Sequence, residues 1–258
     1  IPRNSALGAT PWATALARAH NHHIRMSRML GKYGAITMGR KVHFLTQIFI
    51  ETGLLRTVRE EGQGTPNPNL PKAQYYAAFY GRGYMQLTWA INYDRYGVYR
   101  GFPNHSGAYV DTRITQNSTH VWSDFNPETQ QPTYRQWAPR YDPDKLITDD
   151  YTCADSGGYY WVSKTFRGTS NITRVSDLGL EPRFVGFASW LINGGGNGYA
   201  ERHGFARYLY NVLGDEPRLT GIEIWRYPPL GAALTGTFPP GNPPNTQTIR
   251  VDHAQQIP

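Results

Sequence analysis

The chain has 258 residues and a formal net charge of +7, and its composition is poor in charged residues (17%) and rich in aromatic ones (14%). A typical domain carries about 25% charged residues, so we expect a surface that is basic, mostly uncharged and rich in tyrosine. No apolar run reaches the roughly 20 residues that span a bilayer. The single cysteine, Cys153, excludes an internal disulfide and a cysteine-based zinc cluster. One large domain or two small ones remain.

The N-terminal part predicts two helices. Residues 12–31 show loose helical spacing of apolar residues, and residues 38–52 show a stronger pattern that Gly53 ends. The chain begins with Ile1, and its first 20 residues lack the apolar core of a signal peptide, so we expect either a removed leader or a piece of a longer chain, and favour the piece.

The middle of the chain is less regular. Glycine and proline make 60–71 a loop, and 81–89 is predicted to be a turn and short strand that leads into a helix. Residues 98–139 lack sustained periodicity, and we expect them to be an irregular excursion over the surface.

Periodicity returns further along, at 157–164 and 184–194, and a last helix is predicted from about 200 to 213, closed by Gly214. The tail, 215–258, holds eight of the 19 prolines, which favours an extended strap or linker over a second core.

Carboxylates are the first candidates for chemistry. Glu51 stands at the end of a largely apolar helix, where the helix dipole and apolar walls disfavour its charged form, as a general acid requires. Glu60 and Glu61 open the following loop, and a loop carboxylate facing a helix-end carboxylate is typical of a glycosidase acid and base pair. The alternative for all three is a solvated surface charge.

The segment FYGRGYMQLT, residues 79–88, is a candidate ligand site. Two glycines flank Arg82 and allow close approach to a ligand, and Tyr80 and Tyr84 offer flat faces for sugar rings. Gln86 and Thr88, two apart on a strand, would point the same way. A structural β-hairpin with packed tyrosines is an equal alternative.

Five motifs occur in an order that resembles family 19 glycoside hydrolases, the plant-type chitinases and their bacterial and phage relatives that cut peptidoglycan. The resemblance covers about 24–214 and is carried by Glu51-Thr52-Gly53, GRGYMQLT (81–88), NYDRYG (92–97), WLINGG (190–195) and ERHGFARYLYNVLG (201–214).

The resemblance implies a role for each matching position. It implies that Glu51 is the general acid, Glu60 (or else Glu61) the general base, and Thr88 the residue that positions the attacking water. It places substrate contacts at Tyr80, Arg82, Tyr84, Gln86 and Asn92, at a buried cleft-floor Asn193, and at Arg202 in the following helix.

Two departures from the plant pattern favour the peptidoglycan-cutting branch. Asn197 stands where plant members carry a Glu, and TWAINYDRYG replaces their compact SHNYNYG. Ile50 also replaces the usual His before the acid. The 98–139 segment matches nothing in the family and is expected to be an insertion.

Other constellations are weaker. His20, His22 and His23 face different directions on a helix and lack accompanying carboxylates, so we expect no metal site. Two acidic neighbours oppose a thiolate at Cys153. Arg and Lys are scattered and no nucleic-acid module is visible, so we expect no nucleic-acid partner.

The sequence therefore predicts a mainly α (α+β, lysozyme-like) two-lobed domain at 24–214, with a short β element at its cleft, an N-terminal extension at 1–23 and a tail at 215–258. The expected activity is inverting hydrolysis of β-1,4 bonds in bacterial cell-wall peptidoglycan, by a monomer without cofactors or membrane partner. Alternatives are a chitinase, a lytic transglycosylase and a non-catalytic wall-binding module. A secreted or delivered lysin is expected, with an immunity protein as partner if the chain is an antibacterial effector.

Overall fold

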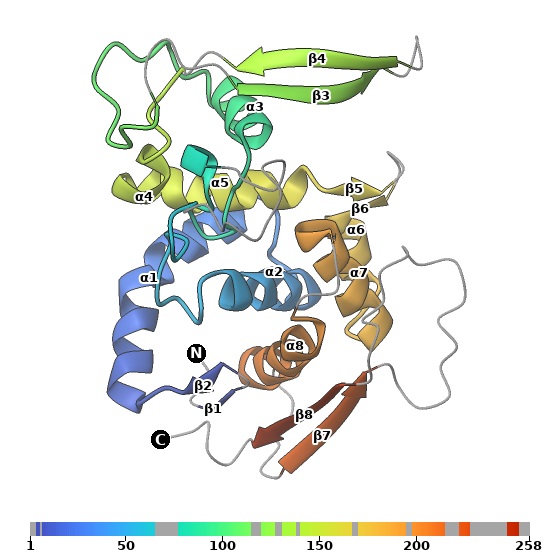
Figure 1. The fold of residues 1–258 in the computed structure, drawn as a ribbon. Coiled ribbons are helices and arrows are strands. Elements are labelled where there is room, and N and C mark those ends of the chain that lie inside the picture. Colours follow the sequence, from blue (N-terminus) through green and yellow to red (C-terminus); the bar gives the residue numbers. More distant parts are fainter. Residues whose placement is uncertain are drawn as a thin grey trace. The chain divides into compact units, whose positions relative to one another are not determined.

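The computed structural model describes residues 4–5, 7–64, 77–114, 120–126, 131–137, 140–166, 170–194, 198–214, 222–227 and 247–252. Most of these residues are helical, and the strands form four two-stranded antiparallel sheets (Figure 1). The prediction of a mainly α fold with short β elements is confirmed. None of the helices in these ranges is long and apolar enough to cross a membrane.

The chain divides into two compact units: unit 1 comprises residues 1–56 and 161–258, and unit 2 comprises 57–160. The elements that begin in unit 1 are β1 (Asn4–Ser5), β2 (Gly8–Ala9), α1 (Trp12–Lys32), α2 (Met38–Glu51), β5 (Thr165–Phe166), β6 (Ser170–Asn171), α6 (Ile172–Asp177), α7 (Pro182–Asn193), α8 (Tyr199–Leu213), β7 (Ile222–Tyr227) and β8 (Gln247–Asp252). Those that begin in unit 2 are η2 (Ala77–Phe79), α3 (Ala90–Arg100), β3 (His120–Asn126), β4 (Gln131–Trp137), α4 (Lys145–Thr148) and α5 (Asp150–Val162).

Unit 1 is built around α2, which contacts α6, α7 and α8 (Figure 1). Phe49 of α2 packs edge-on against Phe205 of α8, with ring centroids 5.8 Å apart. The helix begins at an N-cap, Thr37, whose hydroxyl accepts from the Arg40 N–H. Its C-cap is Thr52, and Gly53 follows with a φ of +55°. The predicted helix and its stop are confirmed, and α2 carries Glu51 as its last residue.

The other predicted helices of unit 1 are confirmed with small shifts at their ends. α1 runs unbroken through position 23, where the sequence analysis ended the N-terminal extension 1–23. The division into an extension, a domain at 24–214 and a tail stays a prediction. Of its apolar residues, Met26 is buried, whereas Trp12 and Leu16 are exposed. α7 ends where Gly194 takes up the left-handed conformation, with a φ of +70°.

The tail contains secondary structure that the proline content concealed. β7 and β8 form a hairpin, with Ile222 paired to Asp252 and Tyr227 to Gln247, and both strands contact α8. The proline-rich stretch 228–246 lies outside the described residues.

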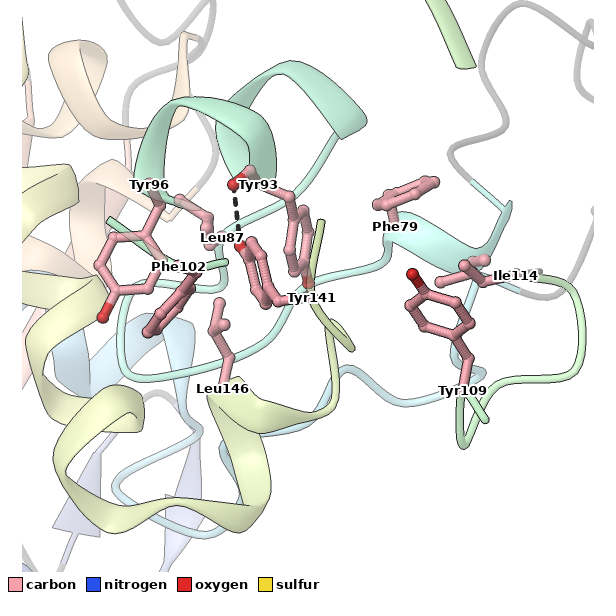
Figure 2. Close-up of a cluster of buried hydrophobic side chains, with 10 residues drawn as sticks. Phe79, Leu87, Tyr93, Tyr96, Phe102, Tyr109, Ile114, Tyr141 and Leu146 are labelled. Atoms are coloured by element: carbon pink, nitrogen blue, oxygen red, sulfur yellow. Dashed lines mark hydrogen bonds between the residues drawn. The ribbon is translucent and has the colours of Figure 1, made fainter. Parts of the chain in front are cut away.

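Unit 2 has its own aromatic core (Figure 2). The Tyr141 hydroxyl donates to the Tyr93 carbonyl oxygen at 2.8 Å, and the ring of Phe102 lies 4.8 Å from that of Tyr141. The cluster consists of Ala78, Phe79, Leu87, Tyr93, Tyr96, Phe102, Tyr109, Ile114, Tyr141 and Leu146.

The core corrects the interpretation of 98–139 as an irregular surface excursion. Phe102, Tyr109 and Ile114 from this segment are buried in the cluster. Further along, β3 and β4, each of seven residues, form an antiparallel hairpin that lies beside α3 (Figure 1). The pattern was missed because strand pairing joins residues on opposite arms of a hairpin, and neither arm alternates clearly between polar and apolar residues.

Candidate functional site

The predicted acid, Glu51, is held by an ion pair within unit 1. Its side chain is 19% exposed, and Nη2 of Arg202 donates to its Oε1 at 2.8 Å. Arg202 comes from α8, whereas Glu51 ends α2, so the contact between these two helices brings the groups together.

A chain of buried hydrogen bonds fixes the Arg202 guanidinium. Its Nη1 donates to Oε1 of Gln47, one turn before Glu51 on α2. The Gln47 amide nitrogen lies 3.3 Å from Oγ of Ser189 on α7, and Ser189 in turn donates to the Val185 carbonyl at 2.7 Å. Three helices therefore position one guanidinium, and through it one carboxylate.

This arrangement corrects two expectations. Arg202 was expected to contact substrate, but it is 1% exposed and its hydrogen bonds go to Glu51 and Gln47. The surroundings of Glu51 were expected to be apolar, and the structure adds the guanidinium of Arg202 to them. Sequence reasoning missed Gln47 and Ser189, because no spacing signal links three separate helices.

Asn193 does not occupy the buried position that the resemblance implies. It is the last residue of α7 and is exposed. The helix ends there because Gly194 turns the chain away from it. Asn197 lies outside the described residues.

In unit 2, the predicted base Glu60 is bonded reciprocally to Gly81 of the GRG turn. The Glu60 N–H donates to the Gly81 carbonyl at 2.9 Å, and the Gly81 N–H donates to Oε2 of Glu60 at 2.7 Å. Glu60 is half-buried, whereas Glu61 is exposed. The geometry therefore orients the Glu60 carboxylate and favours it over Glu61 as the positioned group of this loop.

Arg82 is a core residue of unit 2 and not a surface contact. It is 0% exposed, and its Nε donates to Oδ1 of Asp144 at 2.7 Å. Its Nη1 donates to the Ala78 carbonyl at 2.8 Å, and its guanidinium stacks on the Tyr80 ring at 3.6 Å. Asp144 also accepts from Arg59 at 3.2 Å, so this buried network ties the Glu60 loop to the GRG turn. Sequence reasoning missed Asp144 because nothing near it in the chain marks it.

Tyr80 and Tyr84 were expected to present flat faces to sugar rings. Both are buried, with exposed fractions of 1% and 0%. Burial raises the pKa of the Tyr80 hydroxyl, which lies 3.4 Å from Oδ1 of Asp144. In this structure the two tyrosines are packing residues, which agrees with the alternative interpretation of the segment as a structural one with packed tyrosines.

The segment after the GRG turn is a second turn rather than the predicted strand. Arg82 forms isolated bridges to Leu87 and to Arg59, and Gln86 has a φ of +48°, which breaks the alternation expected for a strand. The Thr88 hydroxyl donates to the Gln86 carbonyl at 2.8 Å, and Nδ2 of Asn92 donates to the Thr88 carbonyl at 2.7 Å. The Thr88 hydroxyl has thereby used its proton, so it can only accept a hydrogen bond from a water molecule.

His20 and His23 of α1 are exposed and His22 is half-buried, and Nδ1 of His23 donates to the His20 carbonyl at 2.8 Å. Within the part of the chain that the structure describes, no three His, Cys, Asp or Glu side chains gather in a way that could hold a metal ion.

No protein-family model and no curated protein sequence matches the chain. Among solved structures, chitinase C from Streptomyces griseus HUT6037 is similar with a TM-score of 0.45 at 19% identity, over 82% of this chain and 87% of that chain. A class IV, family GH19 chitinase from Zea mays gives a TM-score of 0.41 at 16% identity, over 81% and 85%. A bacterial family 19 chitinase gives 0.40 at 18% identity, over 80% and 89%.

Proposed function

We propose that this protein hydrolyses β-1,4 glycosidic bonds in an N-acetylated glycan, with Glu51 as the general acid. The observation that supports it is the placement of Glu51, at the end of an apolar helix and held by a buried arginine that three helices fix. A proton donor has to be held within hydrogen-bond reach of the leaving oxygen, and the fixed orientation of the Glu51 carboxyl supports this role.

The proposed mechanism is a single displacement. Protonated Glu51 donates its proton to the leaving oxygen, and Glu60 takes a proton from a water that donates its other hydrogen to the Thr88 hydroxyl. The hydrogen bond from the Gly81 N–H to Oε2 orients the Glu60 carboxylate, which acts as the base. Inversion at the anomeric carbon follows, because water attacks from the face opposite the leaving group.

The proposed substrate is bacterial peptidoglycan. Its stem peptides are anionic, and the net charge of +7 raises the rate of encounter with such a polymer, an effect that salt weakens. We further propose that the protein acts on the cell wall of a target bacterium. If the protein is an antibacterial effector, its partner is an immunity protein.

The test compares purified sacculi with colloidal chitin. We expect the protein to release reducing ends from sacculi, and Glu51→Gln and Glu60→Gln each to lower the rate by about 10²–10⁴-fold, since this is the usual contribution of a general acid or base. Glu61→Gln is the matched control, because Glu61 is exposed on the same loop.

Each competing function gives a different result. Anhydro-sugar products in mass spectrometry would indicate a lytic transglycosylase, and release from chitin alone would indicate a chitinase. Binding to sacculi without release, unchanged in Glu51→Gln, would indicate a wall-binding module. Full activity of Glu60→Gln would contradict the inverting mechanism.

A further inference from the structure

Trp89 is an exposed aromatic residue next to the predicted water-positioning Thr88. It stands between Thr88 and the start of α3, and 42% of it is exposed. In contrast, Trp161 is fully buried against Phe44. Trp89 therefore presents part of its surface to solvent.

The backbone at Trp89 is strained. Its φ of +76° and ψ of +138° lie near a region that glycine alone normally occupies, at a cost of about 1–3 kcal/mol for other residues. Hydrogen bonds hold it there: its N–H donates to the Phe79 carbonyl at 2.9 Å, and its carbonyl accepts from the Asn92 N–H at 3.0 Å. Glycine would adopt this conformation at little cost, so the indole is retained at the expense of stability.

Strain of this kind also occurs in the segments of the chain that carry Glu60 and Thr88. Among the residues that the structure describes, those other than glycine with positive φ fall in 54–63 and 86–89: they are Leu54, Leu55, Gln63, Gln86 and Trp89. The first segment follows Glu51 and contains Glu60, and the second contains Thr88. Strained backbone persists where the surrounding structure enforces it, and it clusters at binding and catalytic sites.

We propose that Trp89 is a sugar-stacking residue that binds the apolar face of an N-acetylhexosamine ring of the glycan, an inference that rests on the function proposed above. The negative face of an indole attracts the C–H groups of a sugar ring, and its rigidity limits the entropy lost on binding. Trp89 takes over the role that the sequence suggested for Tyr80 and Tyr84, since both of these are buried. Thr88 precedes it in the chain, and Nδ2 of Asn92, in the first turn of α3, donates to the Thr88 carbonyl, so hydrogen bonds order the backbone on both sides of Trp89.

The test measures binding by isothermal titration calorimetry in the Glu51→Gln background, where hydrolysis is suppressed. The probes are the β-1,4-linked hexamer of N-acetylglucosamine and peptide-free glycan strands prepared from sacculi. We expect Trp89→Ala and Trp89→Gly to raise Kd at least tenfold for the bound probe, and Trp89→Phe to keep most of the affinity. Trp12→Ala is the matched control, because Trp12 is 37% exposed in unit 1, and its Kd should stay within twofold of the parent.

Trp89→Gly separates a binding role from a structural one. Glycine relieves the strain at this φ, so this variant should unfold at the same temperature as the parent or a higher one while it loses affinity. An unchanged Kd in Trp89→Gly and Trp89→Ala, or a weaker Kd only where the melting temperature also falls, would overturn the proposal for Trp89 alone. A parent that binds neither probe, with a wild type that releases no reducing ends from either polymer, would overturn the proposed function and this inference with it.

Discussion

Arg202 and Glu51 stand 151 positions apart in the chain, yet Nη2 of Arg202 lies 2.8 Å from Oε1 of Glu51. The arginine is nearly inaccessible to solvent, whereas the carboxylate keeps 19% of its side chain exposed. The pair therefore leaves the carboxylate partly exposed to solvent and buries the arginine that orients it.

Replacing the hidden partner should affect stability and activity together. We expect Arg202→Met to lower the free energy of unfolding by about 2 kcal/mol, because Gln47 Oε1 loses its buried donor and Glu51 loses its counter-charge. The rate of reducing-end release should fall as well. In contrast, Glu51→Gln keeps an acceptor for Arg202 and should abolish activity with little change in urea unfolding. Equal stability losses in the two variants would contradict this assignment.

Breaking a buried ion pair in unit 2 should lower the free energy of unfolding far more than breaking a surface pair. Asp144 accepts from Arg82, whose side chain is 0% exposed, at 2.7 Å, so Asp144→Asn removes the nearer carboxylate of this buried arginine and leaves Asp111 at 3.8 Å. We expect a loss of about 3–5 kcal/mol in urea unfolding. The control is Asp177→Asn, which breaks the Arg40–Asp177 pair with side chains 27% and 40% exposed and should cost less than about 1 kcal/mol. Similar losses in both variants would rule out this ranking.

Stability should fall in mild acid because of two buried histidines in unit 1. Burial lowers the pKa of His43 to about 4 and that of His203 to about 3, from an ordinary value of 6.5. The unfolded chain therefore binds more protons, so this stability is fully present above pH 6.5 and is lost as the pH falls toward 4 and then 3. The slope below pH 6.5 should approach roughly 1.4 kcal/mol per pH unit for each histidine.

Melting temperatures measured between pH 7 and pH 4 check this. His43→Gln removes one of the two titrating groups, so the variant should show about half the wild-type decline, although it starts from a lower stability because the buried hydrogen bond to the Gly179 carbonyl changes. A decline as steep as in the wild type would locate the effect in other groups.

The GRG turn depends on Gly83 for two reasons that can be measured separately. Its φ is +77°, and an added Cβ would lie 2.6 Å from Ser156 Oγ and 3.0 Å from the Cys153 carbonyl. Gly101 has a φ of +61° and open space around it, so Gly101→Ala carries the conformational cost alone, about 1 kcal/mol. We expect Gly83→Ala to cost at least twice as much in urea unfolding and to weaken activity, because Gly81 of the same turn holds the Glu60 carboxylate.

Helix positions could be predicted from the sequence where they depend on residues that are neighbours in the chain. Caps and stops such as Gly53 and Gly214 act within one helical turn, so α1, α2, α7 and α8 could be predicted within a few residues. The hairpin β3–β4 could not, since its pairing depends on contacts between two arms rather than on periodicity within one.

The sequence by itself determined the mainly helical class, the carboxylate at the end of α2 and the turn around Arg82, because each depends on a short run of residues. Only the tertiary structure decided which of those residues face solvent. It buried Tyr80, Arg82 and Tyr84, exposed Trp89 and Asn193, and set Arg202 behind Glu51. Exposure and ion pairing are properties of packed helices, and a motif records residue types and spacing but not what lies against them.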